Sequence, residues 1–406
     1  MPDTIPNPPQ LDHPNEAIAA FQGATRPVGV SQSPLGAAAG RVLARDILAD
    51  RDSPPLTVSS MDGFAVRAAE LSGQDVSLPI AVTCHIGRPC EILPKGGVAR
   101  IVTGAPMPEG ADTVVPKENA IESDHVFRLR PDAPPLVRDS FVRHRGENAK
   151  TGDKILTPGE PLMPANIAAA AAFGANTIDI HERVRVAVVI TGDELATHDG
   201  TIEPWTIRDS NSATLTAMFS TLPWIEWVGV CRVADTLTAV RAGLENALES
   251  ADAIIVTGGV SMGESDHVPA AIREINATTL FHRISQRPGK PMLGAVTSTG
   301  VPIFALPGNP VSVAVTSRRI VLPALAHRAG ITRMPAPAAV SLDNPDHKSL
   351  HLVWHRPVRF TTEGHAELIP TQGSGDIVSI ARSDGFIEIP MQTPSAAGPW
   401  PFYPWT

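Results

Sequence analysis

Residues 184–330 constrain the fold most strongly, because apolar strand-like runs alternate there with helix-like segments. RVRVAVVI, ADAIIV and VPIFAL are nearly continuous apolar runs, and HVPAAIREI and SVAVTSRRIVLPALAHRAG read as helices. Strands alternating with helices indicate a mostly parallel sheet with helices on both faces. Ligands bind such sheets beyond the carboxyl ends of the strands. One predicted helix places four leucine and valine side chains on a single face: Leu237, Val240, Leu244 and Leu248.

Three of the predicted strand ends carry unusual loops, TGDEL, TGGVSMGESD and LPGNP. Glycines let backbone N–H groups approach a ligand closely, and the helix that follows favours an anion. Carboxylates in the same loops suggest an anionic ligand held together with a metal ion, or a carboxylate that takes part in chemistry. TGDEL could also be a turn that caps a helix, and Asp266 could simply cap the helix after it. The candidates are Glu194, Gly258, Gly259, Ser261, Gly263, Asp266, Pro307, Gly308 and Asn309.

Two further segments add capping groups and positive charge. IRDSNS offers Asp209, Ser210 and Asn211 ahead of a helix, and capping explains only one of the three. RISQRPGKP carries Arg283, Arg287 and Lys290 around a proline–glycine turn. A solvated basic patch is one interpretation of these cations. Beside anion-friendly loops they supply the missing positive charge for an oxyanion.

The remaining segments predict further domains. From Asn15 to about Ala49 the segments EAIAAF and LGAAAGRVLARDIL have helical spacing and predict one or two helices, and MPANIAAAAAFGA has helical character as well. Residues 51–142 are instead rich in short alternating runs typical of strands. Short strands return after Thr332. We therefore predict a helical domain in two pieces (1–50 and 143–182), an inserted β-rich domain (51–142), an α/β domain (183–330) and a C-terminal β domain (331–406).

Composition excludes several classes of partner. The 33 basic and 42 acidic residues give a formal charge of −9, which argues against nucleic acid or an acidic membrane surface. Cys84, Cys90 and Cys231 lack metal-ligand spacing, and so few cysteines suit a reducing compartment. No secretory signal and no run long enough to span a bilayer is evident, so we expect a soluble cytoplasmic protein.

Eight motifs in order are SSMDGFAV, IVTGAPMPEGADTVV, RGENAKTGD, TGDEL, IRDSNS, TGGVSMGESDHV, RPGKP and LPGNPVS. Together they resemble the molybdopterin molybdenumtransferase family, which includes MoeA and the E domain of gephyrin. The resemblance covers about residues 15–330, and the C-terminal domain more weakly. It implies four domains, with a barrel-like C-terminal one, and a homodimer whose active site lies between the α/β domain of one subunit and the inserted domain of the other.

The implied reaction is insertion of molybdate into adenylylated molybdopterin, with Mg²⁺-dependent release of AMP. Catalytic roles are then implied for Asp62, Thr103, Glu194, Asp266 and Lys290. Metal ligation is implied for Asp62, Glu194, Asp266 and, in the segment QGSGD, Ser374. The other candidates would bind substrate. Many relatives have lysine in place of Arg287, and the two residue types are not interchangeable at an oxyanion site. Phe64 replaces a commoner tyrosine, which removes one possible hydrogen bond.

Two alternatives remain open. A related single-domain family adenylylates molybdopterin on the same α/β fold, but lacks SSMDGFAV and TGAPMPEG. A binding or scaffolding module is the other, since gephyrin relatives also cluster receptors. The adenylyltransferase and the receiving molybdoenzymes are the implied protein partners.

Overall fold

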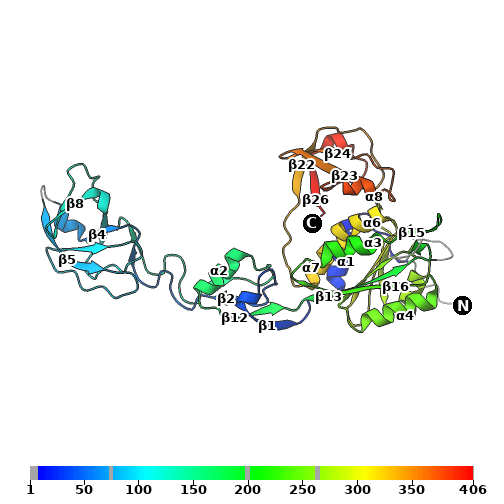
Figure 1. Cartoon of the computed structure of the whole chain (residues 1–406), viewed down its shortest axis with the longest axis horizontal. Coiled ribbons are helices and arrows are strands. Elements are labelled where there is room, and N and C mark those ends of the chain that lie inside the picture. Colours follow the sequence, from blue (N-terminus) through cyan, green and yellow to red (C-terminus); the bar gives the residue numbers. More distant parts are fainter. Residues whose placement is uncertain (1–7, 73–75, 197–201, 261–265, 406) are drawn as a thin grey trace. The chain divides into compact units, whose positions relative to one another are not determined.

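The computed structural model describes residues 8–72, 76–196, 202–260 and 266–405 of the chain (Figure 1). Internal contacts divide the chain into two compact units. The large unit comprises Met1–Arg45, Thr157–Ile167 and Thr177–Thr406, and the insert unit comprises Asp46–Leu156 and Ala168–Asn176. The insertion of a β-rich segment into the chain is therefore visible in the contacts. The four domain boundaries stay a prediction.

A six-stranded sheet forms the centre of the large unit. Its order is β16 (Ile225–Val233), β13 (Val184–Thr191), β17 (Ala253–Thr257), β21 (Pro302–Leu306), β20 (Leu293–Val296) and β18 (Thr278–His282). β16, β13, β17 and β21 are parallel neighbours, and β20 is antiparallel to β21 and to β18, so that β20 alone runs against the other five strands. The mostly parallel sheet predicted from the sequence is confirmed.

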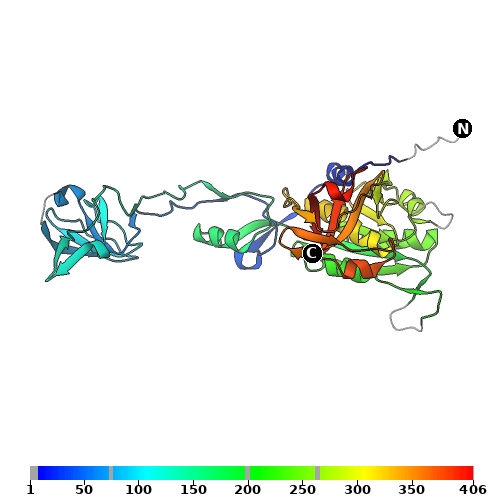
Figure 2. The ribbon, with the colours of Figure 1, turned by 90° about the horizontal axis from the view of Figure 1, so that it is seen from above.

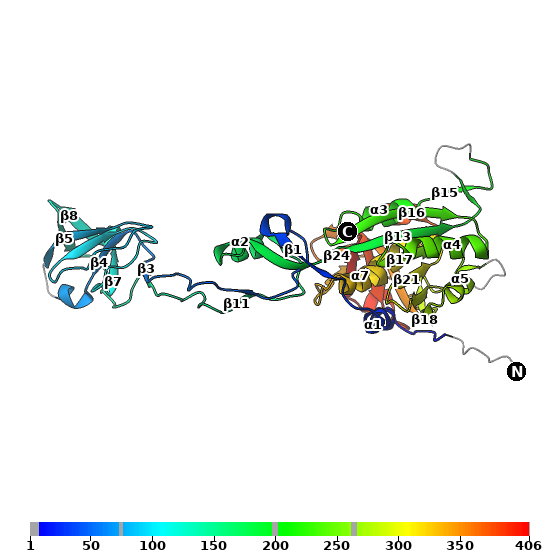
Figure 3. The same ribbon diagram turned by 90° about the horizontal axis from the view of Figure 1, so that it is seen from below.

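Helices cover both faces of this sheet (Figure 3). Val186 and Val188 of β13 pack toward α1 (Pro14–Ala24), α3 (Asn211–Phe219), α6 (Pro310–Thr316) and α7 (Leu322–Arg328). Ala187 and Val189 pack toward α4 (Leu237–Leu248) and α5 (Val268–Glu274). This alternation follows from the period of two in a strand, and it explains why the run reads as continuously apolar. A π-helical segment, η4 (Ser317–Val321), joins α6 to α7.

The end of the chain forms a closed five-stranded barrel (orange to red in Figure 2). Its strands are β22 (Ala338–Leu342), β23 (Val353–Thr362), β24 (His365–Leu368), β25 (Gly385–Ile389) and β26 (Trp400–Pro404), with α8 (Ile377–Ala381) and the turn η5 (Ser395–Ala397) between them. The ring closes where β25 pairs with β23. A two-residue strand, β19 (Gln286–Arg287), leaves the α/β domain and pairs with β23 in parallel.

Of the one or two helices predicted between Asn15 and Ala49, α1 (Pro14–Ala24) is confirmed, and the second, over LGAAAGRVLARDIL, does not form. Only a short turn, η1 (Leu35–Ala37), forms there, and the chain then runs on to β2 (Ile47–Leu48), which pairs with β11 (Lys154–Leu156). Gly40 has φ +73°, and a Cβ there would lie 2.5 Å from Pro223 Cγ. This conformation is incompatible with a helix. β1 (Val30–Pro34) pairs with β12 (Thr177–His181). The helix predicted over MPANIAAAAAFGA is confirmed as α2 (Pro164–Ala172).

A six-stranded sheet also forms the insert unit. Its order is β7 (Thr113–Pro116), β4 (Gly63–Val66), β6 (Val98–Ile101), β5 (Ser77–Cys84), β9 (Val126–Leu129) and β8 (Ala120–Ser123). β3 (Val58–Ser59) pairs with β10 (Val142–Arg143), and short turns, η2 (Ala68–Leu71) and η3 (Lys117–Asn119), complete the unit. The prediction of a β-rich insertion is confirmed.

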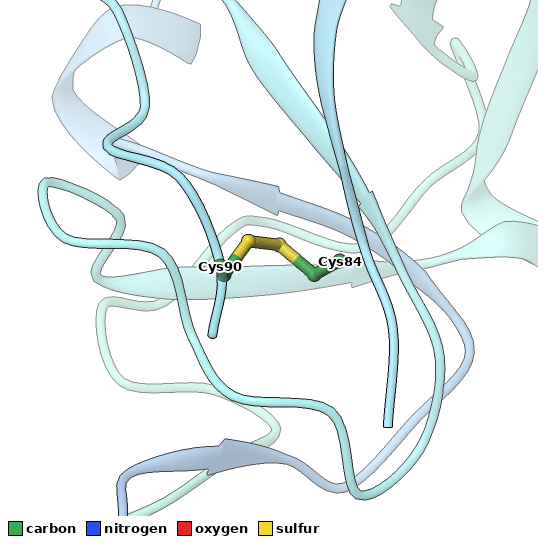
Figure 4. The surroundings of a disulfide bond; sticks show 2 residues. All are labelled: Cys84 and Cys90. Carbon is green, nitrogen blue, oxygen red and sulfur yellow. A yellow bond between two sulfur atoms is a disulfide. The ribbon is translucent and has the colours of Figure 1, made fainter. Parts of the chain in front are cut away.

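Cys84 and Cys90 form a disulfide at the end of β5 (Figure 4). This disulfide was not predicted from the sequence, which was interpreted as having few cysteines suited to a reducing compartment. A loop of only five residues brings the two Cα atoms to 5.2 Å, within the range that a disulfide spans. Cys231 is free and exposed. Within the described segments, every helix falls short of the length and apolar character that a bilayer span requires.

Candidate functional site

Three loops meet at the carboxyl edge of the parallel strands. Gly258, after β17, has φ +92°, and a Cβ there would lie 2.4 Å from the backbone oxygen of Thr191 at the end of β13. A Cβ at Gly308, after β21, would lie 3.6 Å from the Cα of Gly258. Only glycine allows the close approach at position 258, whereas a Cβ at position 308 would make an ordinary van der Waals contact. The predicted convergence of the loops TGDEL, TGG and PGN is therefore confirmed in the structure.

Carboxylates gather at the same edge. Asp235 accepts a hydrogen bond from Thr191 Oγ1 at 2.7 Å, and its backbone N–H donates to Asp193 Oδ1 at 3.1 Å. The Glu194 carboxylate lies over Gly192, where an added Cβ would come within 2.9 Å of Oε1. The sequence analysis missed Asp193 and Asp235. Asp235 stands between a strand and a helix at this edge, as a binding residue would.

TGDEL does not lead into a helix, so the capping alternative for this loop is wrong. The chain continues into a short strand, β14 (Leu195–Ala196), which pairs with β15 (Ile207–Arg208). Glu194 therefore lies between two strands, and its side chain is exposed.

The segment DSN divides its polar groups between capping and packing. Asp209 accepts from the backbone N–H of Ser212 at 2.9 Å and from the Ser212 hydroxyl, so its carboxylate caps the first turn of α3. Arg232 Nη2 lies 3.6 Å from the same carboxylate. Ser210 is the residue before α3 and is half-buried. The expectation that capping explains only one of the three residues agrees with these contacts.

Two buried acceptors at this edge lack a hydrogen-bond partner among the described residues. Asn211 donates from Nδ2 to the Gly308 carbonyl at 2.8 Å, but its Oδ1 is unpaired. The hydroxyl of Thr257, the last residue of β17, is unpaired as well. Buried polar atoms are normally satisfied, and unpaired ones indicate a place for a ligand or water.

The loop TGGVSMGESD is described only in part. Gly258 and Gly259 are half-buried in the structure, whereas Ser261 and Gly263 lie outside the described residues. Asp266 is half-buried and precedes His267, the N-cap of α5.

A cleft of about 1240 Å³ separates the α/β domain from the barrel. Five of the sequence candidates line it: Arg287, Lys290, Pro307, Asn309 and Ser374. Arg283 is not among its lining residues; its carbonyl accepts a hydrogen bond from the Leu11 N–H at 3.0 Å, and its backbone has φ +84°. The cleft thus brings together the RPGKP loop, the PGN loop and the QGSGD segment, which are far apart in the sequence.

Two cations that the sequence analysis missed also line the cleft, Lys348 and Arg356. Arg356 pairs with Asp346 at 2.8 Å and lies 4.3 Å from the centre of the Trp354 ring. Burial works against ionisation of Asp346, but hydrogen bonds from Arg356 and Ser395 hold its pKa below the ordinary value. With Arg287 and Lys290, the cleft carries four cations. Only their position in the folded barrel identifies the two missed ones.

Asp62 and Thr103 meet in the insert unit. β4 and β6 pair with Gly63 opposite Ile101, which places the residues just outside each strand side by side. Asp62 Oδ1 accepts from the backbone N–H of Thr103 at 2.8 Å and from its hydroxyl at 2.9 Å. These bonds hold the pKa of Asp62 below its ordinary value. The Asp62 carboxylate is exposed, and its lowered pKa keeps it ionised at neutral pH.

The residues that the structure describes hold no cluster of three or more side chains placed to bind a metal ion. Mg²⁺ is often bound by one or two carboxylates together with water and substrate phosphates, so the acidic edge of the sheet fits such an ion. Asp62 belongs to the other unit, and Ser374, whose carbonyl accepts from the Val311 N–H at 3.1 Å, lines the cleft. The metal-ligand set stays a prediction.

Comparison with known families identifies three matching regions. Residues 13–174 match the family model "MoeA N-terminal region (domain I and II)". Residues 187–327 match "Probable molybdopterin binding domain", and residues 342–398 match "MoeA C-terminal region (domain IV)".

Whole-length relatives agree. A protein named molybdopterin molybdenumtransferase from Synechococcus elongatus is 30% identical over 376 residues, covering 90% of this chain and 91% of its own. One of the same name from Nostoc is 32% identical, covering 88% and 84%. A crystal structure of a molybdopterin biosynthesis MoeA protein from Pyrococcus horikosii is 26% identical with a TM-score of 0.77, covering 98% of this chain and 100% of its own.

Proposed function

The chain belongs to the molybdopterin molybdenumtransferase family, a family of transferases of molybdenum cofactor biosynthesis, and we propose that it inserts molybdate into adenylylated molybdopterin with Mg²⁺-dependent release of AMP. The observation that carries the proposal is the cleft with four cations beside an acidic, glycine-lined sheet edge. An oxyanion and a phosphorylated pterin require these two environments side by side.

The pterin substrate is assigned to the carboxyl edge of the parallel strands. The loops that carry Gly258 and Gly308 meet at this edge, and the unpaired oxygens of Asn211 and Thr257 can accept hydrogen bonds from a ligand. Substrate contacts by Asp209, Ser210, Gly259, Ser261, Gly263 and Arg283 stay predictions from the family resemblance.

Molybdate is assigned to the cleft. Arg287 and Lys290 come from the loop between β18 and β20, and Arg356 and Lys348 come from the barrel segment. Guanidinium forks bind oxyanions through two parallel hydrogen bonds, and lysine adds a point charge. In an acidic chain this cluster provides the positive potential that a doubly charged anion requires.

The chemistry needs no covalent nucleophile. Water adds to the phosphoanhydride, its P–O bond breaks, and AMP leaves while the phosphate of the pterin is regenerated. The two dithiolene thiols bind molybdenum in place of one molybdate oxide, which leaves as water with their two protons. Mg²⁺, when bound, offsets the charge of the phosphates. We assign Asp62, Glu194 and Asp266 to hold that ion, and Lys290 and Arg287 to stabilise the departing phosphate. The low pKa of Asp62 keeps it ionised for this task.

We also propose that the protein acts as a cytoplasmic homodimer in which Asp62 and Thr103 serve the partner's site. The adenylyltransferase and the molybdoenzymes that receive the product are proposed as further partners. In a reducing compartment Cys84 and Cys90 would stand as two thiols.

A turnover assay tests the proposal. Purified protein is mixed with adenylylated molybdopterin, Mg²⁺ and molybdate, and AMP and molybdenum cofactor are followed together. We expect AMP release that depends on molybdate. Tight pterin binding with no AMP release would overturn the proposal and favour a binding module. Asp266→Asn should keep the fold and lose metal insertion.

A further inference from the structure

A buried ionic cluster, consisting of Arg319, Glu388 and His355, lies where the α/β domain meets the barrel. Arg319 of η4 binds Glu388 of β25 through Nε at 2.6 Å and Nη2 at 3.1 Å. His355 of β23 meets the same carboxylate from Nε2 at 3.0 Å. The three residues are 5%, 7% and 2% exposed. None of them belongs to the candidate residues of the proposed reaction.

The charge states of this cluster follow from its contacts. Burial tends to raise the pKa of Glu388, but hydrogen bonds from His355 and Arg319 outweigh it and lower the pKa to about 2. Burial lowers the pKa of His355, so the imidazole is neutral and donates from Nε2. Arg319 also donates to Asn15 Oδ1 at 2.7 Å and lies 5.1 Å from the centre of the Tyr403 ring. Burying such an ion pair costs desolvation free energy, and removing only one of its partners strongly destabilises the fold because it leaves a buried charge unpaired.

The cluster is directly connected to the wall of the cleft. His355 stands on β23 between Trp354 and Arg356, and all three line the cleft. Trp354, the residue before His355 on β23, pairs with Arg287 of β19. The backbone N–H of Val353 donates to the Ser285 carbonyl at 2.9 Å. β23 therefore carries one cleft arginine and holds the segment that carries another.

We propose that Arg319, Glu388 and His355 are positioning residues for anion binding in the cleft. By anchoring β23 and β25 to the helix α6–η4–α7, they set the separation between Arg356 on the barrel and Lys290 and Asn309 on the α/β domain. The inference rests on the proposed function for the identity of the anion. It extends that function because the three residues act through Arg287 and Arg356 rather than on the substrate.

The test uses Glu388→Gln in the full-length protein, because glutamine keeps the shape and removes the charge. Calorimetric titration with molybdate and the split between KM and kcat are measured together. We expect the dissociation constant and the KM for molybdate to rise about tenfold, with kcat changed less, because misplacing a binding group weakens the contact it makes. Arg319→Lys keeps the charge and loses the fork, so it should restore only part of the affinity lost in Arg319→Met.

A control comes from Arg185, which binds Asp252 through two nitrogens at 2.9 Å in the same unit, does not line the cleft and is more exposed than the cluster. Arg185→Met should lower stability and leave molybdate affinity unchanged. Unchanged molybdate affinity in folded Glu388→Gln would overturn the inference, as would an equal loss in Arg185→Met. Wild-type protein that binds molybdate but releases no AMP would overturn the proposed function alone, so the two failures are distinguishable.

Discussion

The sheet edge and the cleft differ in how they are built. The edge consists of loops directly after β13, β17 and β21, and its shape depends on the close approach of Gly258 to the backbone of Thr191. The cleft consists of side chains from segments far apart in the sequence, from Gln286 in the loop at 286–291 to Gly375 in the barrel segment, 89 positions later. The edge is therefore sensitive to a single Cβ, whereas the cleft is sensitive to charge and to the docking of two domains.

The largest effect is expected at the edge, for Gly258→Ala. The added Cβ would meet the backbone oxygen of Thr191 at a positive φ, so the free energy of unfolding should fall by roughly 2–4 kcal/mol. Gly300→Ala is the control, because Gly300 has φ +82° and no atom near the added Cβ. It should cost only about 1–2 kcal/mol. Chemical unfolding of both variants checks this, and equal losses would mean that close approach does not shape the edge.

A pH effect should come from the docking of the barrel. The folded pKa of Glu388 is about 2 against 4.5 for an ordinary glutamate, so its stabilisation is fully present above pH 4.5 and is lost as the pH falls toward 2. The groups facing it are Arg319, His355 and, at 3.8 Å, His13. One such proton contributes a slope of at most about 1.4 kcal/mol per pH unit. Urea unfolding between pH 2.5 and 5 should show a shallower slope in Glu388→Gln, and identical slopes would contradict the assignment.

The insert unit offers a change that should leave the cleft alone. The Cys84–Cys90 bond closes a loop of five residues between the two cysteines. Opening this bond should lower the free energy of unfolding by about 2 kcal/mol, because it restores conformational entropy to the unfolded chain. Thiol titration should find one free thiol before reduction and three after it, with Cys231→Ser as the control. A change in molybdate affinity when this disulfide is reduced would show that the insert unit influences the cleft.

The smallest effect is expected for a single cleft cation. Arg356→Met should weaken molybdate binding about tenfold, or about 1.4 kcal/mol, because three other cations remain. Arg356→Lys should lose less, since it keeps the charge without the fork. Calorimetric titration measures both. Binding unchanged in Arg356→Met would place the anion elsewhere.

The sheet edge could be predicted from the sequence to a greater extent than the cleft. The strands, the covered sheet and the edge loops follow from periodicity and from glycines at strand ends, because those signals are local. Asp62 and Thr103 came from motif resemblance, and strand pairing then placed them in contact. Arg356, Lys348 and the Arg319 cluster were missed, because no local pattern tells which barrel side chain faces the α/β domain. The false helix at 35–48 shows that apolar spacing yields to a glycine such as Gly40 that tertiary contact holds at positive φ.

Anomalous diffraction from a crystal soaked with tungstate, a heavy analogue of molybdate, would locate the oxyanion site. We expect a tungsten peak in the cleft, within reach of Lys290, Arg287 and Arg356. A peak outside the cleft, with none inside it, would show that the cleft cations do not form this site.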